Sequence, residues 1–436
     1  MIETKWRFKN LDEVLEFLES RERYGSKPGM MRIRRLLGRL GNPEDRVYTI
    51  HIAGTNGKGS VGAYLESIFH QSRMYTFHFS SPAVFDWRDS WKRFGDHVSE
   101  YYLIDCASKV YAATYSLDRQ YIHPTRFEVE TAMAILGSTT FYNDVLILET
   151  GMGGLNDATN IIKWPKMCVF TNISYDHMQV LGNTLTEIAT EKAGIIKPGC
   201  KVFSAEQEPE VKAVLDEKMI YGKVTYVDNS ALELISQKPG ELKFRYKDME
   251  YETSLSGLYQ MKNAALAIEI ARNMKFPEEM ITNGIKEAKW DGRFQVLSEE
   301  PYFIIDGAHN VDAIKQLAET VKISFTNEPI NFIIGVLKDK EHEKMMEIIA
   351  PMAKRILTIT PQNARGMDGS ELAEEIRKWH GDVVSCESIE EAVTMAMDEG
   401  RETGCATLAL GSLSYLGEVK NCHDNYLKKQ EILCLM

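Results

Sequence analysis

The sequence lacks several features that define large classes of proteins. Its seven cysteines are scattered and form no C-x-x-C pair, which disfavours a zinc site or a disulfide framework and predicts reduced thiols. No apolar run approaches the roughly 20 residues of a membrane-spanning helix, and the opening residues are amphipathic and acidic, unlike a signal peptide. Basic residues are not in excess, since the net charge is −12, and this disfavours a general nucleic-acid surface. We therefore expect a cytoplasmic monomer without membrane or nucleic-acid partners.

The length and the order of the apolar segments predict an α/β protein with two domains. A chain of 436 residues is too long for one ordinary core. Short apolar runs at 144–150 and 167–174 alternate with helical patterns, which favours a parallel sheet covered by helices, and the same alternation restarts after Gln295–Pro301. We expect an N-terminal domain with a P-loop-type parallel sheet at 1–296 and a smaller C-terminal Rossmann-like α/β domain at 297–436.

Shorter patterns predict local elements within the first domain. An amphipathic pattern over about 10–22 predicts an opening helix, Ser26-Lys27-Pro28-Gly29 has the composition of a turn, and 30–40 again has helical spacing. The segment from Lys201 to Leu255 carries short alternating pieces, and we expect it to add a β-rich edge to the same domain.

The stretch HIAGTNGKGSVGAYLESIF, residues 51–69, is similar to a phosphate-binding loop but breaks its usual pattern. In G-x-x-x-x-G-K-[ST], Ile52 stands in place of the first glycine, and Gly59 stands where a hydroxyl residue should follow Lys58. Strand, glycine loop and helix nevertheless follow one another as such a loop requires. A glycine-rich turn with an incidental lysine is the alternative interpretation.

Each polar residue of this loop has a possible task in holding phosphates. Gly54, Gly57 and Gly59 would let the backbone N–H groups approach phosphate oxygens, and Lys58 could reach the outer phosphates. Ser60 is displaced one place from the usual metal-binding hydroxyl, which weakens its assignment as a metal ligand.

A carboxylate stands at the end of the next predicted strand. Glu149 in LILETGMGGLNDATN stands at the carboxyl end of a buried run, the edge at which open α/β sheets bind ligands. Across from a phosphate loop, such a carboxylate suits Mg²⁺, which takes oxygen ligands and keeps several waters. A strand-end glutamate that caps the following turn is the alternative.

A third polar segment follows the strand predicted at 167–174. Asp176 and His177 stand just after it, and Thr184-x-x-Glu187 is a capping box that starts a helix. His177 is a candidate metal ligand or acid–base group, with a core or turn histidine as the alternative. Lys192 lies near the end of this helix, where a surface lysine favoured by the helix dipole is an equally ordinary interpretation.

A series of motifs in fixed order resembles one family over nearly the whole chain. The motifs are GTNGKGS (54–60), SSP (80–82), RFEVETA (126–132), ETGMGGLNDATN (149–160), TNISYDH (171–177), TEIATEKAGIIKPG (186–199), LSGLYQMKNAALAIE (255–269), WDGRFQV (290–296), IIDGAHN (304–310) and GSLSYLGEV (411–419). They are similar to those of the Mur-type amide ligases and, within these, of the folylpolyglutamate synthase and dihydrofolate synthase family. The family loop places glycine and then serine after its lysine, which accounts for the mismatch at Gly59.

The resemblance implies an ATP-dependent ligase. In such enzymes a substrate carboxylate takes the γ-phosphoryl group of ATP, and the amino group of L-glutamate attacks the acyl phosphate to form an amide. The implied substrates are a folate or dihydropteroate, L-glutamate and ATP, for one or both of the two family reactions. A Mur-type ligase acting on a peptidoglycan precursor and a non-catalytic nucleotide-binding regulator are the alternatives.

The resemblance also assigns the site residues. ATP would be bound by Gly54, Thr55, Asn56, Gly57, Lys58, Gly59, Ser60, Asn263, Arg293 and Asp306. Mg²⁺ would be held by Ser81, Glu149 and His177, with Ser60 as a further candidate, and K⁺ is a second candidate ion. The implied catalytic residues are Lys58, Lys192, His177, Asp306 and His309, with Lys192 carbamylated as often in this family.

Two segments depart from the family pattern. Leu155 and Asn156 stand where the family usually has an arginine after the paired glycines, and the stretch from Trp87 to Asp96 replaces a different family motif. Both lie near the acceptor pocket in relatives. Aromatic residues of the second stretch, such as Trp87 and Trp91, either stack on a flat substrate ring or pack a lid loop.

Overall fold

The computed structural model describes residues 7–25, 29–140, 142–326 and 328–435, without the side chains of 433–435. The predicted turn at residues 26–28 and the side chain of Cys434 therefore lie outside the described residues. The chain divides into two compact units. The first comprises Met1–Ala83, Trp87–Asn229 and Asn263–Ile285, and the second comprises Val84–Asp86, Ser230–Lys262 and Lys286–Met436.

An eight-stranded sheet, counted over the described residues, forms the centre of the first unit. Its strands are β1 (Thr49–Ala53), β2 (Thr76–Phe79), β3 (Trp91–Arg93), β4 (Asp96–His97), β5 (Val145–Glu149), β6 (Met167–Phe170), β7 (Lys201–Ser204) and β8 (Val224–Tyr226). They lie in the order β4-β3-β2-β5-β1-β6-β7-β8. All neighbours from β2 to β8 are parallel, while β3 and β4 pair antiparallel at one edge. This confirms the predicted parallel sheet.

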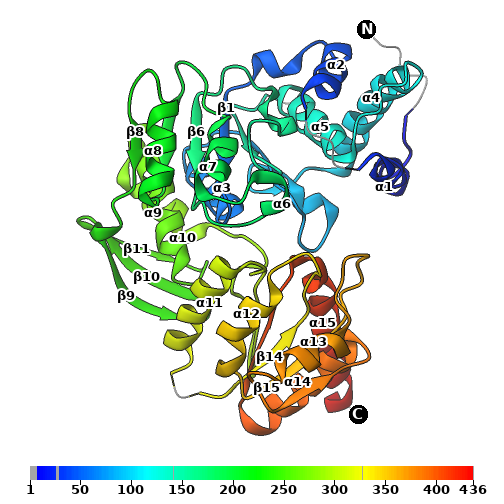
Figure 1. Ribbon diagram of the computed structural model, residues 1–436, viewed down its shortest axis with the longest axis vertical. Coiled ribbons are helices and arrows are strands. Elements are labelled where there is room, and N and C mark those ends of the chain that lie inside the picture. The colour runs from blue at the N-terminus through cyan, green and yellow to red at the C-terminus, as the bar shows by residue number, and fades with distance from the viewer. Residues whose placement is uncertain (1–6, 26–28, 141, 327, 436) are drawn as a thin grey trace. The chain divides into compact units, whose positions relative to one another are not determined.

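The central strands are buried along their whole length, which explains why they appear in the sequence as continuous apolar runs. The helices that join or cover them are α1 (Leu11–Ser20), α2 (Met31–Arg39), α3 (Lys58–Gln71), α4 (Glu100–Asp118), α5 (Arg126–Thr140), α6 (Met178–Leu181), α7 (Leu185–Ala193), α8 (Pro209–Lys218), α9 (Tyr259–Asn273) and α10 (Glu278–Glu287). Helices α1, α2, α4 and α5 pack on one another as a group within this unit (Figure 1).

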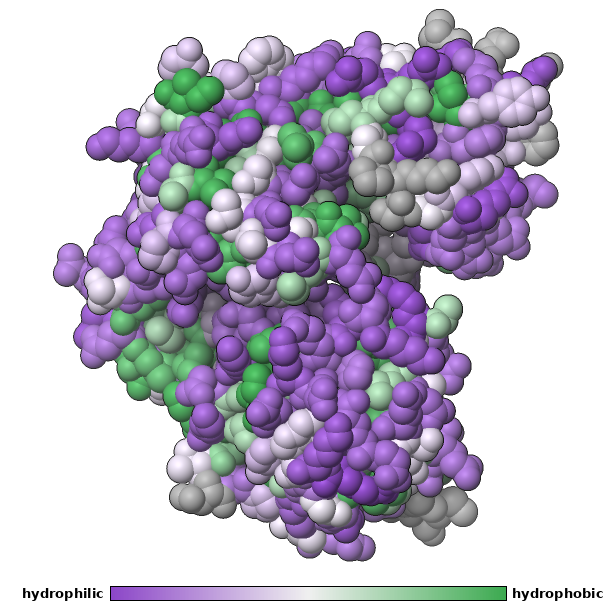
Figure 2. All heavy atoms as spheres, viewed as in Figure 1, coloured by the Kyte–Doolittle hydropathy of each residue, from purple (hydrophilic) through white to green (hydrophobic). Residues whose placement is uncertain are grey.

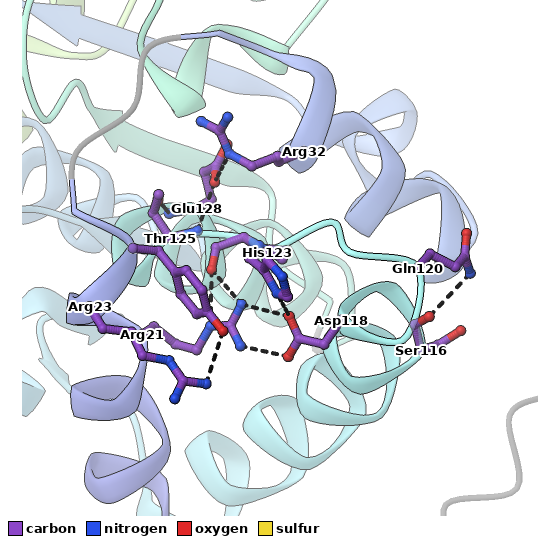
Figure 3. Close-up of polar contacts among 11 residues, drawn as sticks. Arg21, Arg23, Arg32, Ser116, Asp118, Gln120, His123, Thr125 and Glu128 are labelled. Carbon is purple, nitrogen blue, oxygen red and sulfur yellow. Dashed lines mark hydrogen bonds and ion pairs between the residues drawn. The ribbon is translucent and has the colours of Figure 1, made fainter.

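A buried arginine fastens this helical group (Figure 3). Arg21, which is 2% exposed, donates two hydrogen bonds to the Asp118 carboxylate, at 2.7 and 3.0 Å, and two to Pro124 O, at 2.9 and 2.7 Å. His123 Nδ1 lies 2.7 Å from the same carboxylate. The end of α1 is thereby tied to the end of α4 and to the segment that leads into α5.

The second unit contains two separate sheets in the described part of the chain. Strands β9 (Leu232–Lys238), β10 (Glu241–Tyr246) and β11 (Met249–Thr253) form a small antiparallel sheet. The larger sheet has β12 (Gln295–Glu299), β13 (Tyr302–Ile305), β14 (Ile330–Ile334), β15 (Arg355–Thr358), β16 (Val383–Ser385) and β17 (Ala406–Leu410), in the order β12-β13-β17-β14-β15-β16. From β13 to β16 the neighbours are parallel, and β12 is antiparallel to β13. The smaller Rossmann-like sheet expected from the sequence is thus present.

Helices of the second unit follow the predicted alternation. They are α11 (Val311–Ser324), α12 (His342–Ile349), α13 (Gly369–Ile376), α14 (Ile389–Thr403) and α15 (Leu416–Leu435). Helix α11 packs on α12, and α14 packs on α15 (Figure 1). The predicted domain boundary between residues 296 and 297 falls inside β12, while the compact units interleave along the chain. The domain limits therefore stay a prediction.

Two local expectations are corrected. The segment 201–255 only partly extends the first sheet: β7 and β8 form its edge, but β9, β10 and β11 pair with one another and belong to the second unit. The departure at 87–96 is not a loop throughout, because β3 and β4 form a hairpin in it. Trp91 is fully buried, with ring centroids 4.9 Å from Phe79 and 5.3 Å from Trp87, so for Trp91 the packing interpretation holds.

The face shown in Figure 2 is mostly hydrophilic, with hydrophobic residues in separate groups. Among the helices that the structure describes, none combines the length and the apolar composition that crossing a bilayer requires. The cysteine side chains that the structure describes, Cys106, Cys168, Cys200, Cys386, Cys405 and Cys422, are free thiols.

Candidate active site

Three chain segments of the first unit meet at the carboxyl edge of its parallel sheet. β1 pairs with β5 on one side and with β6 on the other. The glycine loop follows β1, Glu149 ends β5, and the segment after Phe170 follows β6. The N–H of Thr55 donates to Asn172 O at 2.7 Å, which joins the first and third segments. This is the edge at which open α/β sheets bind ligands.

The glycine loop turns from β1 into α3 as predicted. Gly57 is the N-cap residue of this 14-residue helix, so the loop stands at the positive end of the helix dipole. Gly54 has a φ of 153°, and a Cβ there would lie 1.8 Å from Thr171 Oγ1, so a larger residue does not fit. Asn263 lies against the loop, because a Cβ on Gly57 would be 2.4 Å from its Oδ1. The backbone therefore permits the close approach that a phosphate group needs.

Lys58 places an ammonium group between the loop and Glu149. Its Nζ donates to Gly54 O at 3.3 Å and to Thr55 O at 3.2 Å, and it lies 3.6 Å from Glu149 Oε1. The side chains of Lys58 and Glu149 are 15% and 7% exposed, so this ion pair is largely shielded from water and salt. The structure thus brings together two residues that the sequence singled out in separate motifs, Lys58 in the glycine loop and Glu149 at the end of a strand.

Lys192 is buried, so its interpretation as a surface lysine is wrong. Its side chain, on the last turn of α7, is 4% exposed, and Nζ donates to Gly54 O at 2.7 Å. Burial lowers the pKa of Lys192 to about 7, the charge of Lys58 acts in the same direction, and Asp176 and Asp157 oppose it. A large fraction of this amine is therefore uncharged at neutral pH.

The segment after β5 packs closely against the backbone at Lys192. A Cβ on Gly154 would lie 2.6 Å from Lys192 O and 2.7 Å from Glu191 O. The N–H of Leu155 donates to Glu191 O at 2.7 Å, and Asn160 Nδ2 donates to Leu155 O at 2.9 Å. The paired glycines and the EKAG motif therefore form one packing interface, which holds Lys192 against the glycine loop.

The sequence did not predict a buried network of side-chain hydrogen bonds next to this interface. Asp157 accepts hydrogen bonds from the N–H groups of Met152, at 2.9 Å, and Thr159, at 3.0 Å, and from the Thr159 hydroxyl. Because that hydroxyl gives its hydrogen to Asp157, it accepts from His51 Nε2 at 2.8 Å. Burial lowers the pKa of His51 to about 3, so the imidazole is neutral. The Asp-x-Thr spacing, typical of an Asx turn, was the available signal.

The predicted metal ligands start from the same sheet edge. Ser81 follows β2, the neighbour of β5, and Ser60 is buried on the first turn of α3. His177 is the N-cap residue of α6, is 42% exposed, and its imidazole lies 3.8 Å from the Asp176 carboxylate. Within the described residues, no group of three or more His, Cys, Asp and Glu side chains is arranged to hold a metal. The assignments of these ligands stay predictions.

The donor chemistry at this edge nevertheless fits Mg²⁺. Glu149 supplies a buried anionic oxygen next to a loop shaped for phosphates. Mg²⁺ at phosphate sites is commonly held by one or two protein carboxylates, with phosphate and water oxygens completing its shell. A cluster made only of protein ligands is therefore not required here.

Asp306 is the centre of a hydrogen-bond cluster in the second unit. Its side chain is 2% exposed, and its carboxylate accepts from Tyr259 Oη and from the N–H groups of Phe294 and Ala308, each at 2.8 Å. Burial raises the pKa of Asp306, and the charge of Arg293 opposes that shift. Asp306 thereby ties the start of α9 to the segments on either side of the β12–β13 hairpin.

The other predicted residues of this unit make local contacts. His309 Nδ1 donates to Gly307 O at 2.7 Å, and the Arg293 guanidinium donates to Gly292 O at 2.9 Å. These contacts fix the loop conformation but do not show a ligand contact. The roles predicted for Asp306, His309 and Arg293 in ATP binding or catalysis stay predictions.

Comparison with known proteins identifies the family to which this architecture belongs. Residues 52–271 match the Mur ligase middle domain, and residues 292–413 match the Mur ligase glutamate ligase domain. The chain is 34% identical over 365 residues to the dihydrofolate synthase/folylpolyglutamate synthase of Bacillus subtilis, covering 80% of this chain and 85% of that protein. It is 31% identical over 359 residues to the folylpolyglutamate synthase of Lacticaseibacillus casei, covering 78% and 82%.

Solved structures agree with these relatives. Mycobacterium tuberculosis folylpolyglutamate synthase complexed with ADP superposes with a TM-score of 0.86 at 26% identity, covering 95% of this chain and 98% of that chain. Escherichia coli FolC in complex with DHPP and ADP gives a TM-score of 0.81 at 25% identity, with coverage of 98% and 100%. The chain therefore belongs to the folylpolyglutamate synthase and dihydrofolate synthase family of Mur ligases.

Proposed function

We propose that this protein is an ATP-dependent ligase that joins L-glutamate to the carboxylate of a folate, of dihydropteroate, or of both. The observation that carries the proposal is the Lys58–Glu149 pair beside the glycine loop, at the ligand-binding edge of the first sheet. Family membership supports the acceptor class, since the relatives in Bacillus subtilis and Lacticaseibacillus casei are named for these activities.

The reaction proceeds in two steps. A carboxylate oxygen of the acceptor attacks the γ-phosphorus of ATP, the bond from that phosphorus to the bridging oxygen breaks, and ADP leaves. The amine of glutamate then attacks the acyl carbon, phosphate leaves with its bonding electrons, and the amine gives up a proton as the amide forms. Because little covalent chemistry falls to the protein in the first step, positioning and charge stabilisation dominate it.

The residues of the first unit supply that positioning. The loop N–H groups and the start of α3 would bind phosphate oxygens, and Lys58 would neutralise charge on the transferring group. Glu149 would hold Mg²⁺, with Ser81, His177 and Ser60 as the further ligands inferred from the family. When bound, this ion neutralises phosphate charge and orients the γ-phosphoryl group.

Lys192 would act as a carbamate. Its buried amine, with a pKa of about 7, is sufficiently deprotonated at neutral pH to add CO₂, which gives a carbamate anion and releases a proton. The anion would place negative charge next to Lys58 and the glycine loop, where a metal or a charged hydrogen bond could use it. The position of Lys192 against Gly54 supports this proposal.

One experiment separates the candidate activities. Purified protein is incubated with ATP, Mg²⁺ and glutamate and with either dihydropteroate or a reduced folate monoglutamate, and both ADP and product mass are measured. A mass increase of one glutamate residue, coupled to ADP, is expected with at least one acceptor. ATP hydrolysis without an acceptor, or no turnover with either one, would contradict the ligase assignment. A monomeric state, a cytoplasmic location and a requirement for K⁺ stay predictions from the sequence.

A further inference from the structure

Acceptor groups of three residues in the first unit surround the Lys58 ammonium group. A lysine ammonium has three N–H donors and no acceptor. Two of the acceptor groups are loop carbonyls that accept hydrogen bonds, Gly54 O at 3.3 Å and Thr55 O at 3.2 Å, and the third is the Glu149 carboxylate, which forms an ion pair with Oε1 3.6 Å away. A phosphate oxygen that binds Lys58 therefore competes with these partners.

Glu149 is the partner that a phosphate displaces with the largest electrostatic consequence. Both are anions that compete for one cation, whereas the carbonyls are neutral and belong to the loop itself. Glu149 is 5% exposed, so water screens its negative charge only weakly. A triphosphate that arrives without a metal would add several negative charges beside this carboxylate, in a site where such charges interact strongly.

Lys192 cannot relieve this repulsion by exchanging partners easily. Its Nζ already donates to Gly54 O at 2.7 Å, and the carbamate proposed above would add a negative charge instead of a positive one. A divalent cation, in contrast, compensates both anions, because it binds the carboxylate and the phosphate oxygens together.

We propose that Glu149 makes nucleotide binding selective for the magnesium complex of ATP, because it competes with the phosphates for Lys58. The proposal rests on the function proposed above and deepens it: the carboxylate excludes metal-free ATP as well as holding the metal. Lys58 moves from Glu149 to the triphosphate as the metal moves onto Glu149, so the two exchanges are coupled.

The test measures ATP binding by calorimetry, once with EDTA and once with excess Mg²⁺, in the absence of any acceptor or glutamate. Wild-type protein should bind metal-free ATP weakly and the magnesium complex at least about tenfold more tightly. Glu149→Gln should tighten the binding of metal-free ATP by about tenfold or more, so that the dependence on Mg²⁺ largely disappears. Glu210→Gln, which removes an exposed negative charge from α8 of the same unit, should behave like wild type.

Lys58→Ala separates competition from simple repulsion. If Glu149 acts through Lys58, Glu149→Gln should produce a much smaller gain in metal-free affinity when Lys58 is already Ala. An equal gain in both backgrounds, or weaker metal-free binding in Glu149→Gln, would overturn the proposal. Thermal unfolding establishes that each variant is folded, and Glu149→Ala provides a second variant with the same expectation. Failure of every variant and of wild type to bind ATP under either condition would instead contradict the proposed function.

Discussion

Gly154→Ala should destabilise the first unit and reduce activity through Lys192. The added Cβ would lie 2.6 Å from Lys192 O and 2.7 Å from Glu191 O, and both atoms are backbone, so no flexible side chain can yield. Overpacking of this kind typically costs about 1–3 kcal/mol. Displacement of the segment would also weaken the 2.7 Å hydrogen bond from Leu155 N–H to Glu191 O, which contributes about 1 kcal/mol. The expected loss is therefore about 2–4 kcal/mol.

Urea unfolding followed by tryptophan fluorescence measures the loss, and glutamate-dependent ADP release measures the activity. Gly38→Ala is the matched control, because Gly38 is an exposed residue of α2 whose added Cβ would meet only Asn42 Oδ1 at 3.7 Å. In that helix the same substitution should stabilise by up to about 1 kcal/mol. If Gly154→Ala unfolds at the wild-type urea concentration with unchanged turnover, the packing argument for Lys192 is wrong.

Four further predictions test other parts of the molecule. Lys58→Ala should lower acceptor-dependent turnover by roughly 10²–10⁴-fold, and near-normal rates would exclude its role at the phosphates. Lys192→Ala should lose most activity and regain part of it with added acetate. In the wild-type protein, activation by bicarbonate should become stronger as the pH rises through about 7, because the neutral amine of Lys192 predominates above that pH. The pKa of His51 is lowered from 6.5 in the unfolded chain to about 3 in the folded protein, so as the pH falls the unfolded chain binds the proton first. Between pH 6.5 and about 3, the free energy of unfolding should therefore decrease by about 1.4 kcal/mol for each pH unit of acidification because of this residue. Urea unfolding at a series of pH values should show a smaller loss of stability in acid for His51→Gln. Arg21→Ala should cost about 2–4 kcal/mol, because it leaves the buried Pro124 O and the partly buried Asp118 carboxylate without their donor. Arg23→Ala on the exposed neighbour should change stability by less than about 0.5 kcal/mol in the same assay.

Most of the central sheet was predictable because its strands are buried from end to end. The strands at 49–53, 145–149 and 167–170 appear as apolar runs, and the glycine loop marks where the first one stops. Short strands near the surface gave no such signal. Trp91–Arg93 and Asp96–His97 contain charged and aromatic residues in too few positions for a pattern. They are strands because β3 pairs with β2 and β4 pairs with β3.

The site was predictable where function is local and not where it depends on distant packing. Glu149 ends β5 and Lys58 stands after the loop that follows the neighbouring strand β1, so the sheet edge brings them together. Lys192 stands in a helical turn where a surface lysine is ordinary, but Gly154 packs against its backbone and its Nζ donates to Gly54 O, so the side chain is buried. The hydrogen bonds from His51 to Thr159 and from Thr159 to Asp157 also connect segments that are far apart in the sequence. Such tertiary contacts produce no periodic pattern in the amino-acid sequence, so the sequence alone does not predict them.

The position of β17 determines when the larger sheet of the second unit can be completed during synthesis. This strand is the last of its sheet along the chain, yet it lies between β13 and β14, with Leu408 beside both Ile304 and Phe332. During synthesis, the earlier strands emerge with a gap between them, and their facing edges stay open until Ala406–Leu410 leaves the ribosome. Open edges of this kind invite pairing with other chains. We therefore expect nascent chains interrupted before β17 to depend on chaperones and to aggregate when these are scarce.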